Sequence, residues 1–570
     1  MYWLNENSKA FLEKGYLLEG ITAEQRIRQI AEYAEKILNK KGFAEKFYEY
    51  MSRGYYSLAS PIWSNFGLSK GLPISCFSSY LGDDMGQILF TQAEVGMMTK
   101  FGGGTAGYFG DLRHRGAKIK DNGTSSGAVH FMRLFESLVN VVSQGSVRRG
   151  HFAPYLPMDH GDIDEFLEIG TEGNPIQELT YGVTVTNTWL EDMVTGDQKK
   201  RDLWAKVLAR RKQMGYPYIF FTDTVNDNTV DVYKDKNLKI HASNLCSEIL
   251  LPSNEEWSFV CDLSSLNLLH FDEWKDTDAV ETLIYFLDAV MSDFISRLEA
   301  MRDSEDSHKK QVFHLMKRAY DFACANRALG AGVLGWHSYL QSKMIPFESD
   351  QAKKINNEIF ETIHKQAYEA SKKMAQEYGE PSVLAGYGRR NTTLLALAPT
   401  TSSAFILGQV SQSIEPIWSN CYVKDIDKMK VTIKNPFLEK VLEKKGHNTR
   451  EVWQTIRDND GSVQHLDILN EKEKLVFRTF AEIDPYMVID QAADRQRFID
   501  QGQSLNLMID PTLSTKEVNA LHLHAWKSGI KTLYYQHSMN AAQQFGRKKL
   551  QENKKNIITV EQNMCVSCEA

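Results

Sequence analysis

The sequence has few cysteines, no long apolar run and no excess of basic charge. Seven cysteines among 570 residues are too few for a disulfide-stapled scaffold. No apolar run approaches the ~20 residues that a membrane-spanning helix needs, and the first residues lack the charged and then apolar pattern of a signal peptide. With 66 basic and 73 acidic side chains, the net charge of −7 gives no basic footprint for DNA or RNA. We therefore expect a cytoplasmic protein that binds neither a membrane nor a nucleic-acid polymer.

The overall composition is that of a folded globular protein. Hydrophobic residues make up 42% and charged residues 24% of the chain, which excludes a disordered or fibrous protein. At ~100–200 residues per domain, the 570 residues correspond to about three to five domains or to one large barrel with attachments.

Hydrophobic spacing predicts alternating helices and strands. Apolar residues recur every three or four positions over 24–50, 131–142, 280–295 and 355–374, and they alternate over 181–186. Helices that alternate with strands over several hundred residues predict a parallel α/β core, either open or closed. Residues 425–515 are richer in charge, which predicts a peripheral insertion.

Two cysteines form a pair close to the C-terminus. Cys565 and Cys568 follow the polar stretch 547–556, which has too little apolar surface to favour an ordered structure, so we expect residues 546–570 to form a flexible tail. A C-x-x-C pair either closes a disulfide or supplies half of a zinc site. Zinc needs about four ligands, and no second C-x-x-C or histidine pair lies nearby. The favoured interpretation is a tethered dithiol that exchanges with another disulfide.

The segment 241–249 carries the most specific chemical pattern. If its backbone is extended, Asn244, Cys246 and Glu248 share one face, because side chains two residues apart point the same way. That face then offers a carboxamide, a thiol and a carboxylate to one small ligand. The spacing alone fits a polar strand edge with an incidental cysteine equally well.

The segment from Asn244 to Ile249 also resembles the active-site loop of the large, catalytic subunit of class I ribonucleotide reductases. Further matches occur in the same order along nearly the whole chain: Ser75-Cys76 and Cys261 resemble the two redox-active thiols, Ala398 to Ser403 the substrate phosphate loop, Tyr534-Tyr535 the radical-transfer pair, and Cys565 with Cys568 the tail dithiol. This resemblance implies a ten-stranded α/β barrel over 73–424 and 516–545, preceded by a helical domain over 1–72. The loop that carries Cys246 would thread into the barrel centre.

The resemblance also implies a chemical role for each central residue. A sulfur radical at Cys246 would remove the 3′-hydrogen of a ribonucleotide, and Glu248 would take the 3′-hydroxyl proton as general base. Asn244 would hydrogen-bond the developing carbonyl oxygen. Cys76 and Cys261 would supply the two electrons and become a disulfide, which Cys565 and Cys568 would reduce by exchange.

Contacts to substrate and effector follow from the same resemblance. The implied substrate contacts are Ser60, Ser64, Ser75, Pro399, Thr400, Thr401, Ser402 and Ser403, where hydroxyls and backbone groups suit a diphosphate. Without the other motifs, 400–403 would be interpreted as a helix-capping run. The implied contacts to a deoxynucleotide effector are Asp83, Arg113, Gln144 and Arg148.

The tyrosine pair implies a radical generated outside this chain. Its source would be a ferritin-like small subunit that holds the metal or radical cofactor, and we expect no metal or cofactor bound in this chain. The other expected partners are thioredoxin or glutaredoxin, deoxynucleoside triphosphate and ATP effectors, and a second copy joined through helices near 84–98 and 127–142. Many members carry an N-terminal ATP-binding domain, whereas here the helical pattern begins almost at once, so we expect a form without it.

Two other functions remain open from the sequence. A cobalamin-dependent reductase of the same barrel family would need no tyrosine relay, so Tyr534-Tyr535 disfavours it. A nucleotide-sensing redox adaptor would use the tail dithiol and would tolerate loss of Cys246. A diphosphate substrate is favoured, and a triphosphate stays an alternative.

Overall fold

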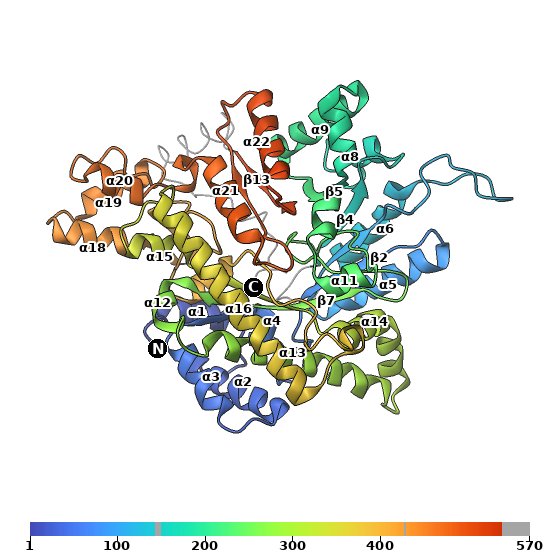
Figure 1. Ribbon diagram of the computed structural model, residues 1–570, viewed down its shortest axis with the longest axis horizontal. Coiled ribbons are helices and arrows are strands. Elements are labelled where there is room, and N and C mark those ends of the chain that lie inside the picture. The colour runs from blue at the N-terminus through green and yellow to red at the C-terminus, as the bar shows by residue number, and fades with distance from the viewer. Residues whose placement is uncertain (143–149, 427–428, 539–570) are drawn as a thin grey trace.

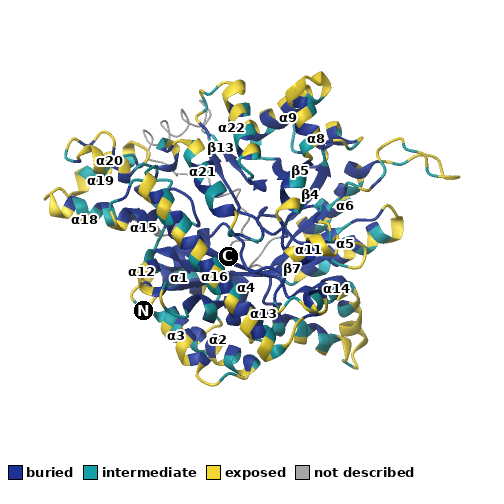
Figure 2. Ribbon diagram, viewed as in Figure 1, coloured by how far each residue is buried: buried dark blue, intermediate teal, exposed yellow. Residues whose placement is uncertain are grey.

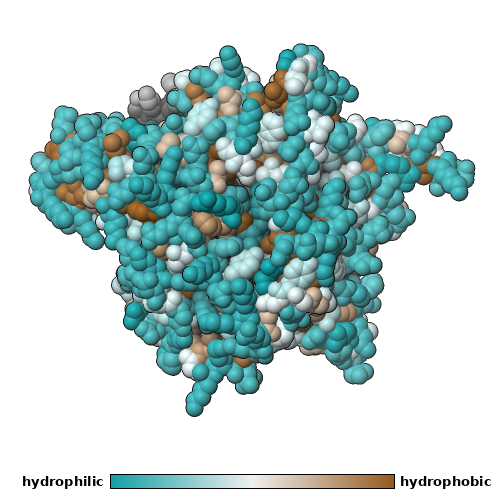
Figure 3. Space-filling view, viewed as in Figure 1, coloured by the Kyte–Doolittle hydropathy of each residue, from teal (hydrophilic) through white to brown (hydrophobic). Residues whose placement is uncertain are grey.

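The structure is a computed structural model that describes residues 1–142, 150–426 and 429–538. Its strands form a buried centre, and the helices around them expose only their outer faces, as Figures 1 and 2 show. On the face drawn in Figure 3, hydrophobic residues lie in small groups among hydrophilic ones. No helix within the described ranges is both long and apolar enough to cross a bilayer.

The N-terminal region consists of short helices: α1 (Glu6–Gly15), α2 (Ala23–Leu38), α3 (Phe43–Ser52) and α4 (Ser60–Asn65). The prediction of one helix over 24–50 is wrong, because α2 and α3 are separate. Asn39 ends α2 at a φ of 49°, and Gly42 precedes α3 at a φ of 87°. Both angles are left-handed and interrupt a right-handed helix.

Ten extended segments form the barrel. One half contains β2 (Cys76–Tyr80), β3 (Gly104–Tyr108), β4 (Phe152–Pro157), β5 (Gly182–Val185) and β6 (Tyr218–Phe221), each parallel to the next. The other half contains β7 (Phe259–Asn267), β8 (Leu329–Leu334), residues 394–398, residues 501–508 with β11 (Leu507–Met508), and residues 532–537 with β12 (Thr532–Leu533) and β13 (Gln536–His537). Parallel pairing or parallel bridges connect these neighbours as well.

Two antiparallel seams join the halves into a closed ring. At the first seam β2 pairs with β7, and at the second β12 pairs with β6. Closure removes the open edges that a curled sheet would otherwise expose. The expected α/β barrel is therefore confirmed. The short strand β1 (Tyr56–Leu58) pairs with the second half of β7, on the same side as β2.

Helices surround the barrel. The longer ones are α5 (Met85–Lys100), α6 (Ala128–Val141), α8 (Asn187–Thr195), α9 (Gln198–Met214), α13 (Ala279–Arg302), α14 (Ser307–Asn326), α16 (Asp350–Tyr378), α21 (Pro485–Gln496) and α22 (Thr515–Lys527). The shorter ones are α7 (Ile163–Phe166), α10 (Thr222–Asp227), α11 (Asp231–Asp235), α12 (Phe271–Trp274), α15 (Trp336–Ser342) and α17 (Thr401–Ile406). The predicted helices over 131–142, 280–295 and 355–374 lie in α6, α13 and α16, and the predicted strand over 181–186 contains β5.

A second, smaller core lies beside the barrel. It is built from β9 (Cys421–Ile426), β10 (Met429–Lys434), α18 (Pro436–Lys444), α19 (Arg450–Asp458) and α20 (Glu471–Val476), and its three helices lie together at one end of the molecule in Figure 1. Leu438, Trp453 and Phe477 are among its buried members. From Phe480 onward, buried residues join the main core.

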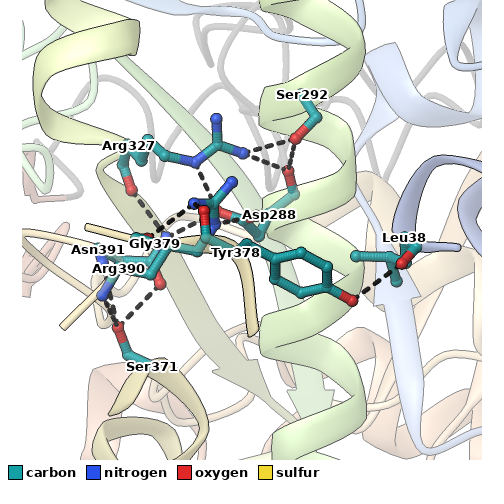
Figure 4. A network of polar contacts seen from close by, with 9 residues as sticks. All are labelled: Leu38, Asp288, Ser292, Arg327, Ser371, Tyr378, Gly379, Arg390 and Asn391. Atoms are coloured by element: carbon teal, nitrogen blue, oxygen red, sulfur yellow. Dashed lines mark hydrogen bonds and ion pairs between the residues drawn. The ribbon is translucent and has the colours of Figure 1, made fainter. Parts of the chain in front are cut away.

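A buried charge network fastens the helices to the start of β8. Asp288 of α13 is hydrogen-bonded at 2.9 Å by both Arg327 and Arg390, and at 3.0 Å by Asn391 (Figure 4). Ser371 of α16 donates in turn to Asn391. Burial favours a higher pKa for Asp288, but the two guanidinium groups outweigh it and hold the pKa below its usual value.

We predict that Asp288→Asn lowers the free energy of unfolding by about 3–5 kcal/mol, because two buried guanidinium groups lose their counter-charge. Since the folded pKa of Asp288 is lowered, its contribution is present above the unfolded pKa of ~4 and is lost as the pH falls through the folded pKa. Urea unfolding at neutral pH and at a series of pH values falling below ~4 measures both effects.

The matched control is Glu49→Gln, which removes the exposed pair of Glu49 with Arg53 and should cost less than ~1 kcal/mol. Equal losses in the two variants would contradict the role assigned to Asp288.

Candidate active site

The loop of residues 241–251 lies inside the barrel, and Asn244, Cys246 and Glu248 on it are completely buried. The predicted extended backbone is wrong at the centre of this loop. Residues 245–247 form a turn, and Ser247 adopts a left-handed φ of 68°. The Asn244 carboxamide oxygen accepts a hydrogen bond from the Ile249 amide at 3.0 Å, which closes the turn. Asn244 therefore shapes the loop that presents the thiol.

Both halves of the barrel hold this loop. From β4, the Tyr155 hydroxyl donates to the Asn244 carbonyl at 3.1 Å. From the opposite half, Gly502 N–H donates to the Glu248 carbonyl at 2.8 Å, and Thr532 Oγ1 donates to the Ser247 carbonyl, also at 2.8 Å. The loop backbone is thus fixed against two walls that belong to different half-barrels.

Two of the predicted redox thiols face each other across the first seam. Cys76 on β2 is the direct cross-strand neighbour of Cys261 on β7, and both are buried as free thiols. Residues directly opposite on antiparallel strands have Cα atoms ~4.5–5.5 Å apart, which a disulfide can span. Burial, together with Asp262 and Cys76, raises the pKa of Cys261 well above its usual value, so this thiol stays protonated. The Gln501 amide nitrogen lies 3.6 Å from its sulfur.

The tyrosine pair lies at the second seam. The ring centroids of Tyr534 and Tyr535 are 4.4 Å apart and meet edge to face, and both residues are buried. Tyr218 of β6 completes the cluster, with its centroid 4.9 Å from Tyr534 and 5.2 Å from Tyr535. Burial raises the pKa of Tyr218 well above its usual value, and Tyr535 and Cys246 raise it further. The cluster therefore extends toward the central thiol.

The predicted phosphate-loop residues are buried at the beginning of α17. Thr400 precedes this helix, and its hydroxyl accepts from Ser413 N–H at 2.7 Å rather than capping the helix. Ser57 on β1 donates to the Ser403 carbonyl at 3.2 Å, which places the loop beside β1 and β7. Pro399, Thr401 and Ser402 complete this buried stretch.

The predicted serine contacts lie on the same side of the barrel. Ser75 immediately precedes β2 beside Cys76, and it is buried. Ser60 begins α4, which follows β1, and it is buried next to the Tyr16 hydroxyl, while Ser64 of α4 is half-buried.

The predicted effector residues are only partly described. Asp83 and Arg113 form an ion pair on the surface, with Nε to Oδ2 at 2.5 Å. Gln144 and Arg148 lie outside the described residues, as do Cys565 and Cys568. Within the described ranges, no group of three or more His, Cys, Asp or Glu side chains is placed to hold a metal ion.

Several residues at the site were not identified from the sequence. Asn506 accepts from Tyr535 N–H at 3.2 Å and donates to Glu415, and burial raises the pKa of Glu415 to about 7. Gln501, Ser504 and Tyr218 also contact the predicted site residues. Residues 501–506 form a mainly polar run between the apolar pairs 498–499 and 507–508, which is the one local signal that could have drawn attention to this segment.

Comparisons with known proteins agree with this geometry. The family model of the ribonucleotide reductase barrel domain matches residues 74–200, 190–383 and 381–536, and that of the ribonucleotide reductase all-alpha domain matches residues 2–71.

Individual relatives match most of the chain. The putative ribonucleoside-diphosphate reductase large subunit of Frog virus 3 (isolate Goorha) is 36% identical, and the alignment covers 93% of each protein. The ribonucleoside-diphosphate reductase large subunit of Invertebrate iridescent virus 3 is 33% identical over 86% of this chain and 87% of that protein. The solved structure of the Actinobacillus ureae class Id ribonucleotide reductase alpha subunit superposes with a TM-score of 0.88 at 55% identity and covers 95% of this chain and 98% of that one. The chain belongs to the ribonucleotide reductase large-subunit family.

Proposed function

We propose that the chain is the catalytic subunit of a class I ribonucleotide reductase, which converts ribonucleoside diphosphates to 2′-deoxyribonucleoside diphosphates. The observation that carries this proposal is the burial of Cys246 inside a closed barrel. Glu248 lies on the same loop, the Cys76–Cys261 pair lies at one seam, and a tyrosine cluster lies at the other. A radical on sulfur has to be kept from solvent, and the complete burial of Cys246 meets this condition.

The central loop would perform the hydrogen and proton transfers. As a thiyl radical, Cys246 would take the 3′-hydrogen and return it at the end of the cycle. Glu248 would accept the 3′-hydroxyl proton as general base. The Asn244 amide nitrogen is buried with no hydrogen-bond partner among the described residues, which suits a donor that waits for a substrate oxygen.

The two seam thiols would reduce the substrate. Loss of the 2′-hydroxyl as water takes two electrons and two protons from Cys76 and Cys261, and a disulfide is left between them. Cys565 and Cys568 would then reduce this disulfide by exchange, and thioredoxin or glutaredoxin would in turn reduce the tail. This cycle requires a reducing compartment, for which we propose the cytoplasm.

The tyrosine cluster supports an external radical source. We propose a ferritin-like small subunit as the partner, whose cofactor supplies the unpaired electron. Tyr535 and Tyr534, with Tyr218 beside them, would pass it to Cys246 in short steps. The cluster disfavours a cobalamin-dependent reductase, which would have no use for it.

We propose that substrate and effector bind at separate places. The residues around 399–403, with Ser60 and Ser75, would hold the substrate diphosphate. Asp83, Arg113, Gln144 and Arg148 would hold a deoxynucleoside triphosphate that selects the substrate, and ATP would be a further effector. We propose a division into 1–72, 73–424 with 480–545, 425–479 and 546–570. The expected insertion over 425–515 ends too late, because buried residues from Phe480 onward join the main core and residues 501–508 form a barrel segment.

A homodimer is the proposed assembly. Helices α5 and α6 pack against each other and expose large apolar side chains, with Met85 54%, Leu89 49% and Val141 83% exposed. Exposed apolar side chains on two neighbouring helices are a feature of protein–protein interfaces. Asp83 lies two residues before α5, so an effector bound there would lie beside this surface.

We predict that mild oxidation of the reduced protein produces a Cys76–Cys261 disulfide, because the two residues are direct cross-strand neighbours. Peptide mapping by mass spectrometry identifies the cross-linked pair. The disulfide should be lost in Cys76→Ser and retained in Cys324→Ser, which alters a half-buried thiol on α14. A disulfide from Cys261 to any other thiol would contradict the assignment.

We predict that activity depends on Cys246 and Glu248 when ribonucleoside diphosphate reduction is assayed with a metal-loaded small subunit and a dithiol reductant. Cys246→Ser should reduce activity to background, because a serine O–H is too strong to yield an equivalent radical. Glu248→Gln should lower kcat by about 10²–10⁴-fold.

Cys324→Ser is the control for these assays and should keep wild-type kcat. Wild-type rates in Cys246→Ser would eliminate the radical mechanism. Activity that needs added cobalamin and no small subunit would favour the alternative reductase.

We predict that Leu89→Glu dissociates the dimer, because it places a charge in an apolar interface. Sedimentation velocity measures the change. Leu18→Glu is the control, since Leu18 is 40% exposed and lies away from α5 and α6. Dimers that persist in Leu89→Glu, or that are lost equally in Leu18→Glu, would refute this surface.

A further inference from the structure

The segment 500–506 lines the site, but none of its residues has a role in the reaction proposed above. Its backbone is fixed against residues 395–397: Gln501 N–H donates to the Leu395 carbonyl at 3.2 Å, Leu397 N–H to the Gly502 carbonyl at 3.0 Å, and Ser504 N–H to the Leu397 carbonyl at 2.8 Å. Ser504 is 3% exposed and therefore sits on a rigid, dry support.

The Ser504 hydroxyl has two partners on the active-site loop. Its oxygen lies 2.6 Å from the Cys246 carbonyl oxygen and 3.0 Å from Glu248 Oε2. A hydroxyl carries one proton and can therefore donate to one of these oxygens at a time. If Glu248 is ionised, both partners are acceptors and compete for this proton. If a proton resides on Oε2, Glu248 can donate to Ser504 Oγ while Ser504 donates to Cys246.

We propose that Ser504 is a positioning residue whose hydroxyl alternates between the Glu248 carboxylate and the Cys246 carbonyl according to the protonation state of Glu248. The inference rests on the proposed function of Glu248 as general base. When the substrate 3′-O–H bond breaks, its electron pair stays on the substrate oxygen, and a lone pair of Glu248 forms the new O–H bond. No group is oxidised or reduced in this proton transfer. The Ser504 proton then turns to the backbone of the residue that bears the reacting sulfur.

This arrangement ties the proton transfer to the geometry of the thiol. In the ionised state the Ser504 hydroxyl donates to the carboxylate and so stabilises the form of Glu248 that can accept a proton. In the protonated state the same hydroxyl anchors the Cys246 carbonyl. The loop is thus held most firmly after Glu248 has taken the proton.

Other titratable groups around Glu248 do not replace Ser504 in this role. The Cys261 thiol on β7 interacts with Glu248 and stays neutral because burial raises its pKa. Charged groups on neighbouring segments have partners of their own: Lys531 donates to the carbonyls of residues 499–501, Asp500 accepts from Leu394 and Leu395 N–H, and Arg495 donates to Gln503 and Asn356.

A purely structural anchor would behave differently, and the loop contains one for comparison. Thr532 Oγ1 lies 2.8 Å from the Ser247 carbonyl oxygen and 3.3 Å from the Gln503 carbonyl oxygen, so its hydroxyl anchors backbone rather than the Glu248 carboxylate. Thr532→Val therefore removes a hydroxyl anchor from the same loop and leaves the carboxylate untouched.

The test is the pH dependence of kcat for the holoenzyme, with small subunit and dithiol, in Ser504→Ala, Ser504→Thr and Thr532→Val. Ser504→Ala should move the acidic limb to higher pH by about one unit, because the carboxylate loses a donor and its pKa rises. Ser504→Thr keeps a hydroxyl and should retain the wild-type limb. Thr532→Val should lower kcat without moving the limb.

An unchanged acidic limb in Ser504→Ala, or an equal shift in Thr532→Val, would overturn the inference. If Ser504→Ala does not fold, Ser504→Cys serves instead, because a thiol is a weaker donor and should shift the limb in the same direction. Glu248→Gln distinguishes failure of the proposed function from failure of this inference. Wild-type activity in that variant would rule out Glu248 as the general base. An inactive Glu248→Gln together with an unshifted Ser504→Ala would remove only the role of Ser504.

Discussion

Closure of the barrel through two antiparallel seams is the constraint on which the rest of the structure depends. Each half-barrel is a parallel sheet, in which all strands run in the same direction. Where the halves meet, strands of opposite direction lie side by side, and the chemistry gathers at these places. The β2–β7 seam sets Cys76 opposite Cys261, and the β6–β12 seam sets Tyr218 beside the tyrosine pair. The loop that bears Cys246 lies between the seams and is held from both sides.

Burial explains why the Cys261 thiol at the site stays neutral. Desolvation disfavours the charged form of every group within the barrel, so Cys261 stays a thiol and Glu415 has a pKa of about 7. A protonated thiol is what hydrogen-atom chemistry requires, whereas a thiolate would act as a nucleophile. Burial also raises the free-energy cost of losing any hydrogen bond to the loop, because water cannot replace the missing partner.

Local pattern was a good guide to the long elements and to the chemical motifs. The helices α13 and α16 follow directly from apolar residues at helical spacing, since such a stripe has to be buried against a core. The split between α2 and α3 was missed although Asn39 and Gly42 carried the signal, because the apolar periodicity continues across the break. The extended backbone expected over 241–249 failed for another reason. Ser247 is held in a left-handed conformation by contacts from Gly502 and Thr532, which lie far away in the sequence.

The sequence by itself determined the family, the α/β class, and the residue types of the reaction, because these are properties of ordered motifs and of short-range spacing. Only the tertiary structure decided which residues meet. It placed Ser504 between Cys246 and Glu248, Gln501 at the Cys261 sulfur, and Tyr218 against Tyr534. These pairings come from strands that are joined at the ring closure. Local sequence preferences cannot predict these pairings, because barrel closure depends on the free energy of the whole buried core and not on any one segment.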